Sequence, residues 1–151
     1  MGSMEVDPAT SKSYACAIGA ALLAFNQMEG ELRDLLLSHP CRYDTEEQID
    51  AELFGAKLRR LERAALQEPN GDLRKELLAL HGRAEPLKYE RDHLAHGALW
   101  VDADGTTLRR FMPFRTRKAD HDDRPPGEIR QLAAAIANLG DDMRALAARL
   151  R

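Results

Sequence analysis

A short stretch in the second half of the chain holds two imidazoles, a carboxylate and a guanidinium: Arg91-Asp92-His93-Leu94-Ala95-His96. Histidine exchanges protons near neutral pH, whereas the planar fork of arginine binds phosphate oxygens but cannot act as a base. On a helix, Asp92 and His96 are neighbours at i and i+4, so Asp92 can orient the His96 ring. His93 neighbours His96 at i and i+3, while Arg91 lies well around the helix. The combination suits phosphodiester chemistry.

A structural interpretation is open for the same residues. Histidines and arginines near the end of a helix often cap it, pair with acids or face solvent without binding any substrate. The spacing of Arg91 and His96 alone therefore does not establish an enzyme.

Two charges stand where apolar stripes predict leucine. The first stripe consists of Ile18, Leu22, Phe25, Leu32 and Leu36, and Glu29 fills its gap. Arg91 fills an equivalent gap in a later stripe. Burying an unpaired charge is costly and pairing recovers much of that cost, so we expect Glu29 and Arg91 to meet inside the protein. The alternative is that both long side chains reach solvent.

Helical periodicity dominates the elements that must position these groups. We expect a first helix from Ser11 to about Leu37 and a second that is capped by Thr45 and runs to about Gln67. Asp72 is expected to cap a third helical region, which Gly82 and Pro86 can kink or split. A last helix follows a polar loop over residues 113–127 and carries Ile129, Leu132, Ile136, Leu139, Met143, Leu146 and Leu150.

Short apolar or β-branched runs at residues 98–101 and 107–111 flank an Asp-Gly pair, which predicts a small β-hairpin. The predicted fold is therefore mainly α, an antiparallel four-helix bundle with a β-hairpin insert before the last helix.

Composition agrees with one helical domain. The chain has 151 residues, a formal net charge of -3 and only 5% aromatic residues. This charge gives no global attraction to nucleic acid or anionic lipid, so such a partner needs a local patch. Met1–Ser3 look like an expression remnant before a domain over residues 4–151. Cys16 and Cys41 suggest free thiols in a reducing cytosol, and no apolar run predicts a membrane span.

The best local patch for RNA lies after the predicted hairpin turn. It combines cations with aromatic rings and has no acidic residue: Arg109, Arg110, Phe111, Phe114, Arg115, Arg117 and Lys118. Arginines can bind backbone phosphates while phenylalanines stack on exposed bases. The alternative is a solvated hairpin edge that is protected by charge, with the rings packed on the bundle.

Arg91, four intervening residues that begin with polar Asp92, and then His96-Gly97 resemble the Arg-x4–6-His motif of the HEPN superfamily. The long first helix with Asn26-Gln27-Met28-Glu29-Gly30 also resembles the family pattern, and so does the place of the motif late in the third helical region. The resemblance covers nearly the whole chain.

This resemblance implies a homodimer in which two motifs form one composite site that cleaves RNA without a metal or other cofactor. By analogy, the 2′-hydroxyl attacks the adjacent phosphorus, His96 moves a proton and Arg91 stabilises the developing charge, with Asp92, His93 and Glu29 in support. Such proteins include toxins and phage-defence factors, so an antitoxin or regulatory protein is a further expected partner.

One departure bears on regulation. Some relatives carry, two residues after the motif histidine, a tyrosine that a partner nucleotidyltransferase modifies, and this chain has Ala98 there. Other relatives have lost catalysis, so the alternative function is a HEPN module that binds RNA, a nucleotide or a protein. A plain structural bundle is a third reading.

Overall fold

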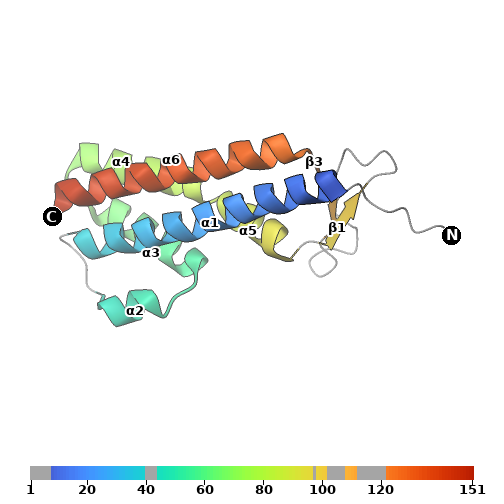
Figure 1. Ribbon diagram of the computed structural model, residues 1–151. Helices are drawn as coiled ribbons and strands as arrows, with labels where there is room; N and C mark the ends of the chain where they lie inside the picture. The colour runs from blue at the N-terminus through green and yellow to red at the C-terminus, as the bar shows by residue number, and fades with distance from the viewer. Residues whose placement is uncertain (1–7, 40–43, 97, 102–107, 112–121) are drawn as a thin grey trace. The chain divides into compact units, whose positions relative to one another are not determined.

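The computed structural model describes residues 8–39, 44–96, 98–101, 108–111 and 122–151. It is mainly helical, which confirms the predicted class. The helices are α1 (Pro8–Ser38), α2 (Glu46–Asp50), α3 (Phe54–Gln67), α4 (Gly71–Ala84), α5 (Leu87–His96) and α6 (Pro126–Leu150) (Figure 1). No helix within these described ranges is both long and apolar enough to cross a membrane.

The chain divides into two compact units. Unit 1 comprises residues 1–24 and 89–135, and unit 2 comprises residues 25–88 and 136–151. Helices α1, α5 and α6 each contribute residues to both units.

The core of unit 1 is small. Tyr14, Ala17 and Ala21 of α1 are buried together with Leu94 of α5 and Ile129 of α6. Partly buried apolar residues pack against this cluster: Ile18, Leu22, Leu132 and Ala133. On α1 the buried positions follow helical spacing, but the buried face runs through Ala17 and Ala21 rather than through the predicted Ile18 and Leu22.

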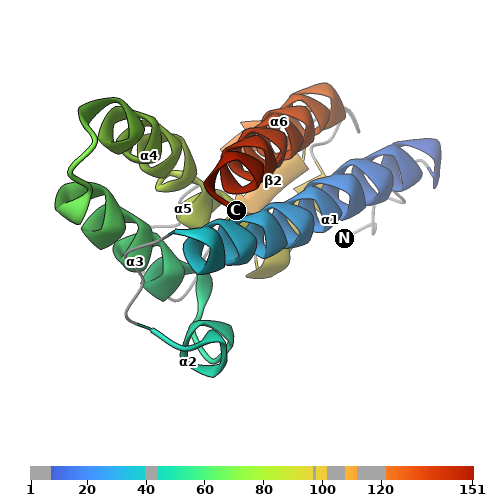
Figure 2. The same cartoon turned by 90° about the vertical axis from the view of Figure 1, so that its left-hand side faces the viewer.

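Unit 2 has the larger set of buried side chains. These come from α1 (Phe25, Met28, Leu32, Leu35, Leu36), α2 (Ile49), α3 (Phe54, Leu58, Leu61, Ala65), α4 (Leu77, Leu80, Ala84), α5 (Leu87) and α6 (Ile136, Leu139, Met143, Leu146, Ala147). Each large apolar side chain that is fully buried contributes roughly 1.5–3 kcal/mol. A Cβ on Gly140 would lie 3.3 Å from the Met28 Cα, so the glycine lets α6 approach the α1 backbone. Helices α3 and α4, which follow one another in the chain, pack against each other (Figure 2).

Three short strands belong to unit 1: β1 (Ala98–Val101), β2 (Leu108–Phe111) and β3 (Asp122–Arg124). They form an antiparallel sheet in the order β1-β2-β3. In its register, Arg109 stands opposite Trp100 and Asp123, and Arg110 stands opposite Leu99 and Asp122. The predicted Asp-Gly turn lies outside the described residues.

The second predicted helix, from Thr45 to Gln67, is wrong as a single element. Thr45 does cap a helix, with Gln48 in a capping box, but α2 ends at Asp50. Leu53 is extended and is the N-cap of α3, which begins at Phe54, while the Glu52 carbonyl accepts a hydrogen bond from Lys57 Nζ. Apolar spacing misses this break because Phe54, Leu58 and Leu61 continue the helical period.

Of three further boundaries predicted from the sequence, two are shifted and one is confirmed. Asn70, rather than Asp72, caps α4, since its side-chain oxygen accepts hydrogen bonds from the backbone N–H groups of Asp72 and Leu73. The third helical region is split around Pro86, as the sequence allows. The expected loop over residues 113–127 instead includes β3 and the start of α6, while residues 112–121 are outside the description.

Candidate functional site at helix α5

Helix α5 places the whole predicted motif on one short element. It begins after Pro86, and Leu94 anchors it in the unit 1 core against Tyr14, Ala17 and Ile129. At about 100° per residue, positions 92 and 96 lie one turn apart and about 160° around the helix from Leu94. The backbone therefore brings these two positions together on the helix side opposite the core anchor.

The Arg91 guanidinium is accessible. Its side chain is 45% exposed, and Nη1 lies 3.5 Å from Oδ1 of Asp92, whose side chain is 26% exposed. This separation is longer than a strong charge-assisted hydrogen bond, which has a donor–acceptor distance of roughly 2.7–2.9 Å. Arg91 thus presents a cationic group to solvent from a helix that is fixed by its apolar side.

His93 is one of the two histidines that the sequence analysis placed in the motif, and its side chain is described. Its ring is half-buried, and Nδ1 is buried with no hydrogen-bond partner in the described part of the structure. A buried polar atom without a partner costs about 1–3 kcal/mol and calls for a specific explanation, such as a role at a site. The geometry is therefore consistent with a supporting role for His93.

His96 is the last residue of α5. Its backbone is described and its side chain is outside the description, as is Gly97. The predicted contact between Asp92 and the His96 ring stays a prediction.

Glu29 has a partner that the sequence reasoning missed. In unit 2, Lys57 Nζ donates to Glu29 Oε1 at 2.9 Å and to the Glu52 carbonyl at 2.9 Å. The Lys57 side chain is 8% exposed and that of Glu29 is 26% exposed. Glu29 and Arg91 belong to different units, and their predicted pairing stays a prediction.

The signal that identified Glu29 was also present for Lys57. Position 57 falls on the buried face of α3 between Phe54 and Leu61, so it is another charge where leucine is expected. Comparing charged gaps across all the helices, including α3, could have found this pair.

A second buried pair in unit 2 involves His39 and Glu68. His39 Nε2 lies 2.7 Å from Glu68 Oε2, and both side chains are nearly inaccessible. The backbone N–H of Asn70 donates to Glu68 Oε1 and holds the pKa of this carboxyl below its usual value, with the His39 contact acting in the same direction. His39 and Glu68 each follow the last residue of a helix, so helical periodicity does not predict their contact.

The predicted RNA-binding patch is described only in part. Arg109, Arg110 and Phe111 lie on β2, whereas Arg115, Arg117 and Lys118 lie outside the described residues. Because β2 is paired on both sides, it is the middle strand of the sheet. The alternative in which these arginines protect a hairpin edge is therefore wrong for Arg109 and Arg110.

Comparisons with protein-family models, curated proteins and solved structures gave no significant match. The residues of this chain and the geometry of α5 therefore supply the observations on its function.

Proposed function

We propose that the protein is a metal-independent endoribonuclease of the HEPN type, with Arg91 and His96 as its catalytic residues. The observation that carries the proposal is the 45% exposure of the Arg91 side chain on α5, a helix that buried Leu94 anchors in the core of unit 1. A purely structural arginine gains most from burial against a partner, whereas a guanidinium that binds RNA phosphate must be reachable from solvent.

The proposed reaction needs one proton donor or acceptor and one cation. The RNA 2′-oxygen forms a bond to the adjacent phosphorus and the bond from phosphorus to the 5′-oxygen breaks. His96 moves a proton in this exchange, and Arg91 stabilises the negative charge that develops on the phosphoryl oxygens. The products are a 2′,3′-cyclic phosphate and a 5′-hydroxyl.

The remaining candidate residues act in support of these two. Asp92, one turn before His96, orients the imidazole, and the half-buried His93 keeps this end of α5 in place. Glu29 is retained as a supporting residue, and in unit 2 its carboxylate accepts a hydrogen bond from Lys57 of α3.

A homodimer completes the proposal. Arg91 and His96 lie about 140° apart around one helix, so a single α5 does not direct both toward the same phosphate. A second copy supplies the complementary group, which is the arrangement that the HEPN resemblance implies for an antiparallel four-helix bundle with a hairpin insert. An antitoxin or another regulatory protein in toxin–antitoxin or phage-defence biology, acting in the cytoplasm, fits this activity.

The direct test is cleavage of a labelled, structured RNA in EDTA by the wild type and by His96→Ala. We expect wild-type products with 2′,3′-cyclic phosphate ends and a loss of rate of about 10²–10⁴-fold in the variant, the usual range for a positioned general acid or base.

The outcomes separate the two functions. Absence of wild-type cleavage across several RNAs, with RNA binding retained and weakened by Arg91→Ala, would replace the nuclease by a non-catalytic binding module. Cleavage that survives His96→Ala would exclude His96 as the proton carrier.

A further inference from the structure

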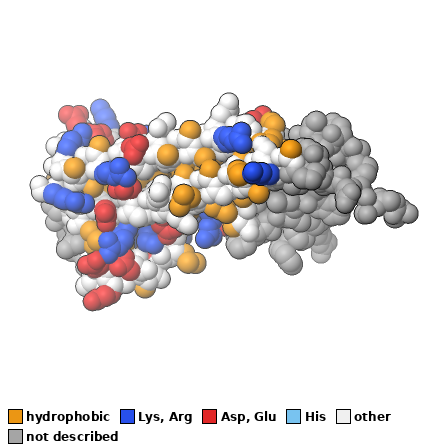
Figure 3. All heavy atoms as spheres, in the orientation of Figure 1, with side chains coloured by type: hydrophobic (Ala, Val, Ile, Leu, Met, Phe, Trp, Pro, Cys, Tyr) orange, Lys and Arg blue, Asp and Glu red, His pale blue; other side chains and the backbone are white. Residues whose placement is uncertain are grey.

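Unit 2 carries a strongly acidic segment between α1 and α3. Residues 44–52 contain five carboxylates and no basic residue: Asp44, Glu46, Glu47, Asp50 and Glu52. The segment includes the short helix α2, which lies beside α1 and α3 in unit 2 (Figure 2). Acidic side chains of this region reach the surface (Figure 3).

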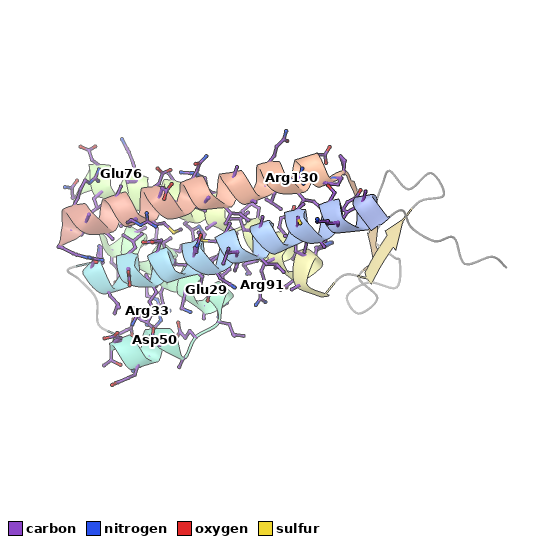
Figure 4. All side chains as sticks on the ribbon, in the orientation of Figure 1. Glu29, Arg33, Asp50, Glu76, Arg91 and Arg130 are labelled. Atoms are coloured by element: carbon purple, nitrogen blue, oxygen red, sulfur yellow. The ribbon has the colours of Figure 1, made fainter. Side chains whose placement is uncertain are left out.

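These carboxylates occupy two arginines of the neighbouring helices. Arg33 of α1 donates from Nε to Asp50 Oδ1 at 2.5 Å and from Nη2 to Asp50 Oδ2 at 3.1 Å, and it also pairs with Glu46 (Figure 4). The Arg33 contact holds the pKa of the Asp50 carboxyl below its ordinary value. Both oxygens of Asp50 therefore engage one guanidinium.

Arg60 of α3 is bound in the same way. Its Nε lies 2.5 Å from Glu52 Oε2 and its Nη2 lies 2.6 Å from Glu52 Oε1, and a further ion pair joins Arg60 to Asp44. Two bidentate carboxylate–guanidinium pairs, formed by Asp50 and Glu52, thus hold the C-terminal end of the segment, and the ion pairs of Asp44 and Glu46 hold its N-terminal end. Phosphate groups of a nucleic acid bind the same guanidinium fork.

Little apolar surface holds the segment in addition. Ile49 is its one buried apolar residue among the described positions 44–52, and neighbouring Leu53 is 84% exposed. The Asp50, Glu46 and Arg33 side chains are between 30% and 63% exposed, and ion pairs with such exposure contribute little stability and weaken with salt. Arg60 and Glu52 are more enclosed, with side chains 14% and 28% exposed, and the Glu52 carbonyl accepts a hydrogen bond from buried Lys57. The attachment at Arg33 is consequently the one that a competing polyanion can displace.

We propose that residues 44–52 form an acidic strap that covers Arg33 and Arg60, and that the RNA backbone binds Arg33 when it displaces the strap from this arginine. The proposal rests on the proposed function only in taking RNA as the polyanion. Strap release and RNA binding are then linked, because RNA binds the released state. Any change that makes release easier strengthens RNA binding by the same factor, as long as the released state is the minor one.

The test uses Glu46→Gln/Asp50→Asn, which removes two negative charges that contact Arg33. The matched control is Glu47→Gln/Glu62→Gln, which removes two charges from α2 and α3 whose carboxylates form no ion pair in the described part of the chain. Both variants change the net charge equally, so any general electrostatic gain in RNA affinity appears in both.

Release is measured by amide hydrogen exchange of Ile49, Ala51 and Glu52, whose N–H groups are hydrogen-bonded within the strap or at its end. RNA affinity is measured with a labelled single-stranded 2′-O-methyl RNA, which lacks the attacking hydroxyl and cannot be cleaved. We expect exchange to rise about fivefold in Glu46→Gln/Asp50→Asn relative to the control, and RNA affinity to rise by the same factor. The same RNA accelerates strap exchange in the wild type.

Faster exchange with an RNA affinity equal to that of the control overturns the proposal, and so does a wild-type strap whose exchange is unaffected by bound RNA. Neither result depends on catalysis. A protein that cleaves RNA but shows no linked strap release refutes the strap alone, and one that shows linked release without cleavage refutes the nuclease alone.

Discussion

Lys57 in unit 2 and Arg91 in unit 1 are both cations on helices whose neighbouring positions are apolar, yet the structure treats them differently. The Lys57 side chain is 8% exposed and donates at 2.9 Å to both Glu29 and the Glu52 carbonyl. The Arg91 side chain is 45% exposed and lies 3.5 Å from Asp92. The first cation is buried among its acceptors, whereas the side chain of the second is nearly half exposed.

This difference teaches that a charge in an apolar stripe has two distinct meanings. A buried cation with short contacts is part of the structure, and removing it leaves acceptors without a donor. An exposed cation on an anchored helix contributes little to folding and is available to a ligand. The comparison predicts opposite consequences for function and stability at Lys57 and Arg91.

The largest expected effect is on RNA cleavage by Arg91→Ala. Removing a donor that stabilises charge in a transition state typically costs about 10²–10³-fold in rate, and we expect a loss of this size. Arg130→Ala is the matched control, since Arg130 is an exposed arginine of α6 in the same unit and donates to Ser13 Oγ at 3.3 Å. Single-turnover cleavage in EDTA measures both. Equal losses in the two variants would contradict a specific role for Arg91.

The next effect is on folding. Lys57→Ala removes the amine that both Glu29 and the Glu52 carbonyl accept from, and we expect the free energy of unfolding to fall by about 2 kcal/mol, less than for a fully enclosed pair because Glu29 is partly exposed. Lys75→Ala on α4, where the lysine is exposed, should leave stability nearly unchanged. Urea unfolding measures the free energy of unfolding of both variants. Equal losses would contradict a structural role for Lys57.

A smaller effect concerns the pH dependence of stability through Glu68. Its pKa lies below the ordinary value of 4.5, chiefly because the Asn70 N–H binds the carboxylate. A lowered pKa in the folded state gives stability that is fully present above pH 4.5 and is lost as the pH falls through the folded pKa. Glu68→Gln should therefore reduce stability at neutral pH and make its decline below pH 4.5 shallower. Parallel declines for variant and wild type in denaturation series would argue against this role.

The smallest expected effect sharpens the opening comparison. Arg91→Ala should change the free energy of unfolding by no more than about 0.5 kcal/mol, because the side chain is 45% exposed and substitutions at exposed positions usually have effects of this size. Thermal and urea unfolding of the same preparation used for cleavage measure this directly. A loss comparable to that of Lys57→Ala would identify Arg91 as a structural cation.

Local signals in the sequence determined the helical class, the capping of α2 by Thr45, the break at Pro86 and the placement of Arg91 to His96 on one helix. These features depend on side-chain to backbone bonds and on apolar spacing within a few residues, so they can be recognised without knowing the fold. The HEPN resemblance and the reaction it implies stay predictions that the cleavage assay tests.

Only the tertiary structure decided which charges meet and which charged side chains are exposed. Lys57 as the partner of Glu29, Glu68 as the partner of His39, the separation of α2 from α3 and the central place of β2 all depend on contacts between segments far apart in sequence or on their packing. Helical periodicity shows that a charge lies on a buried face, but it does not say which oppositely charged group on another helix comes within hydrogen-bonding distance. The pairing depends on how the helices pack, because a buried charge is tolerated only where an oppositely charged or hydrogen-bonding group lies close enough to offset its loss of hydration.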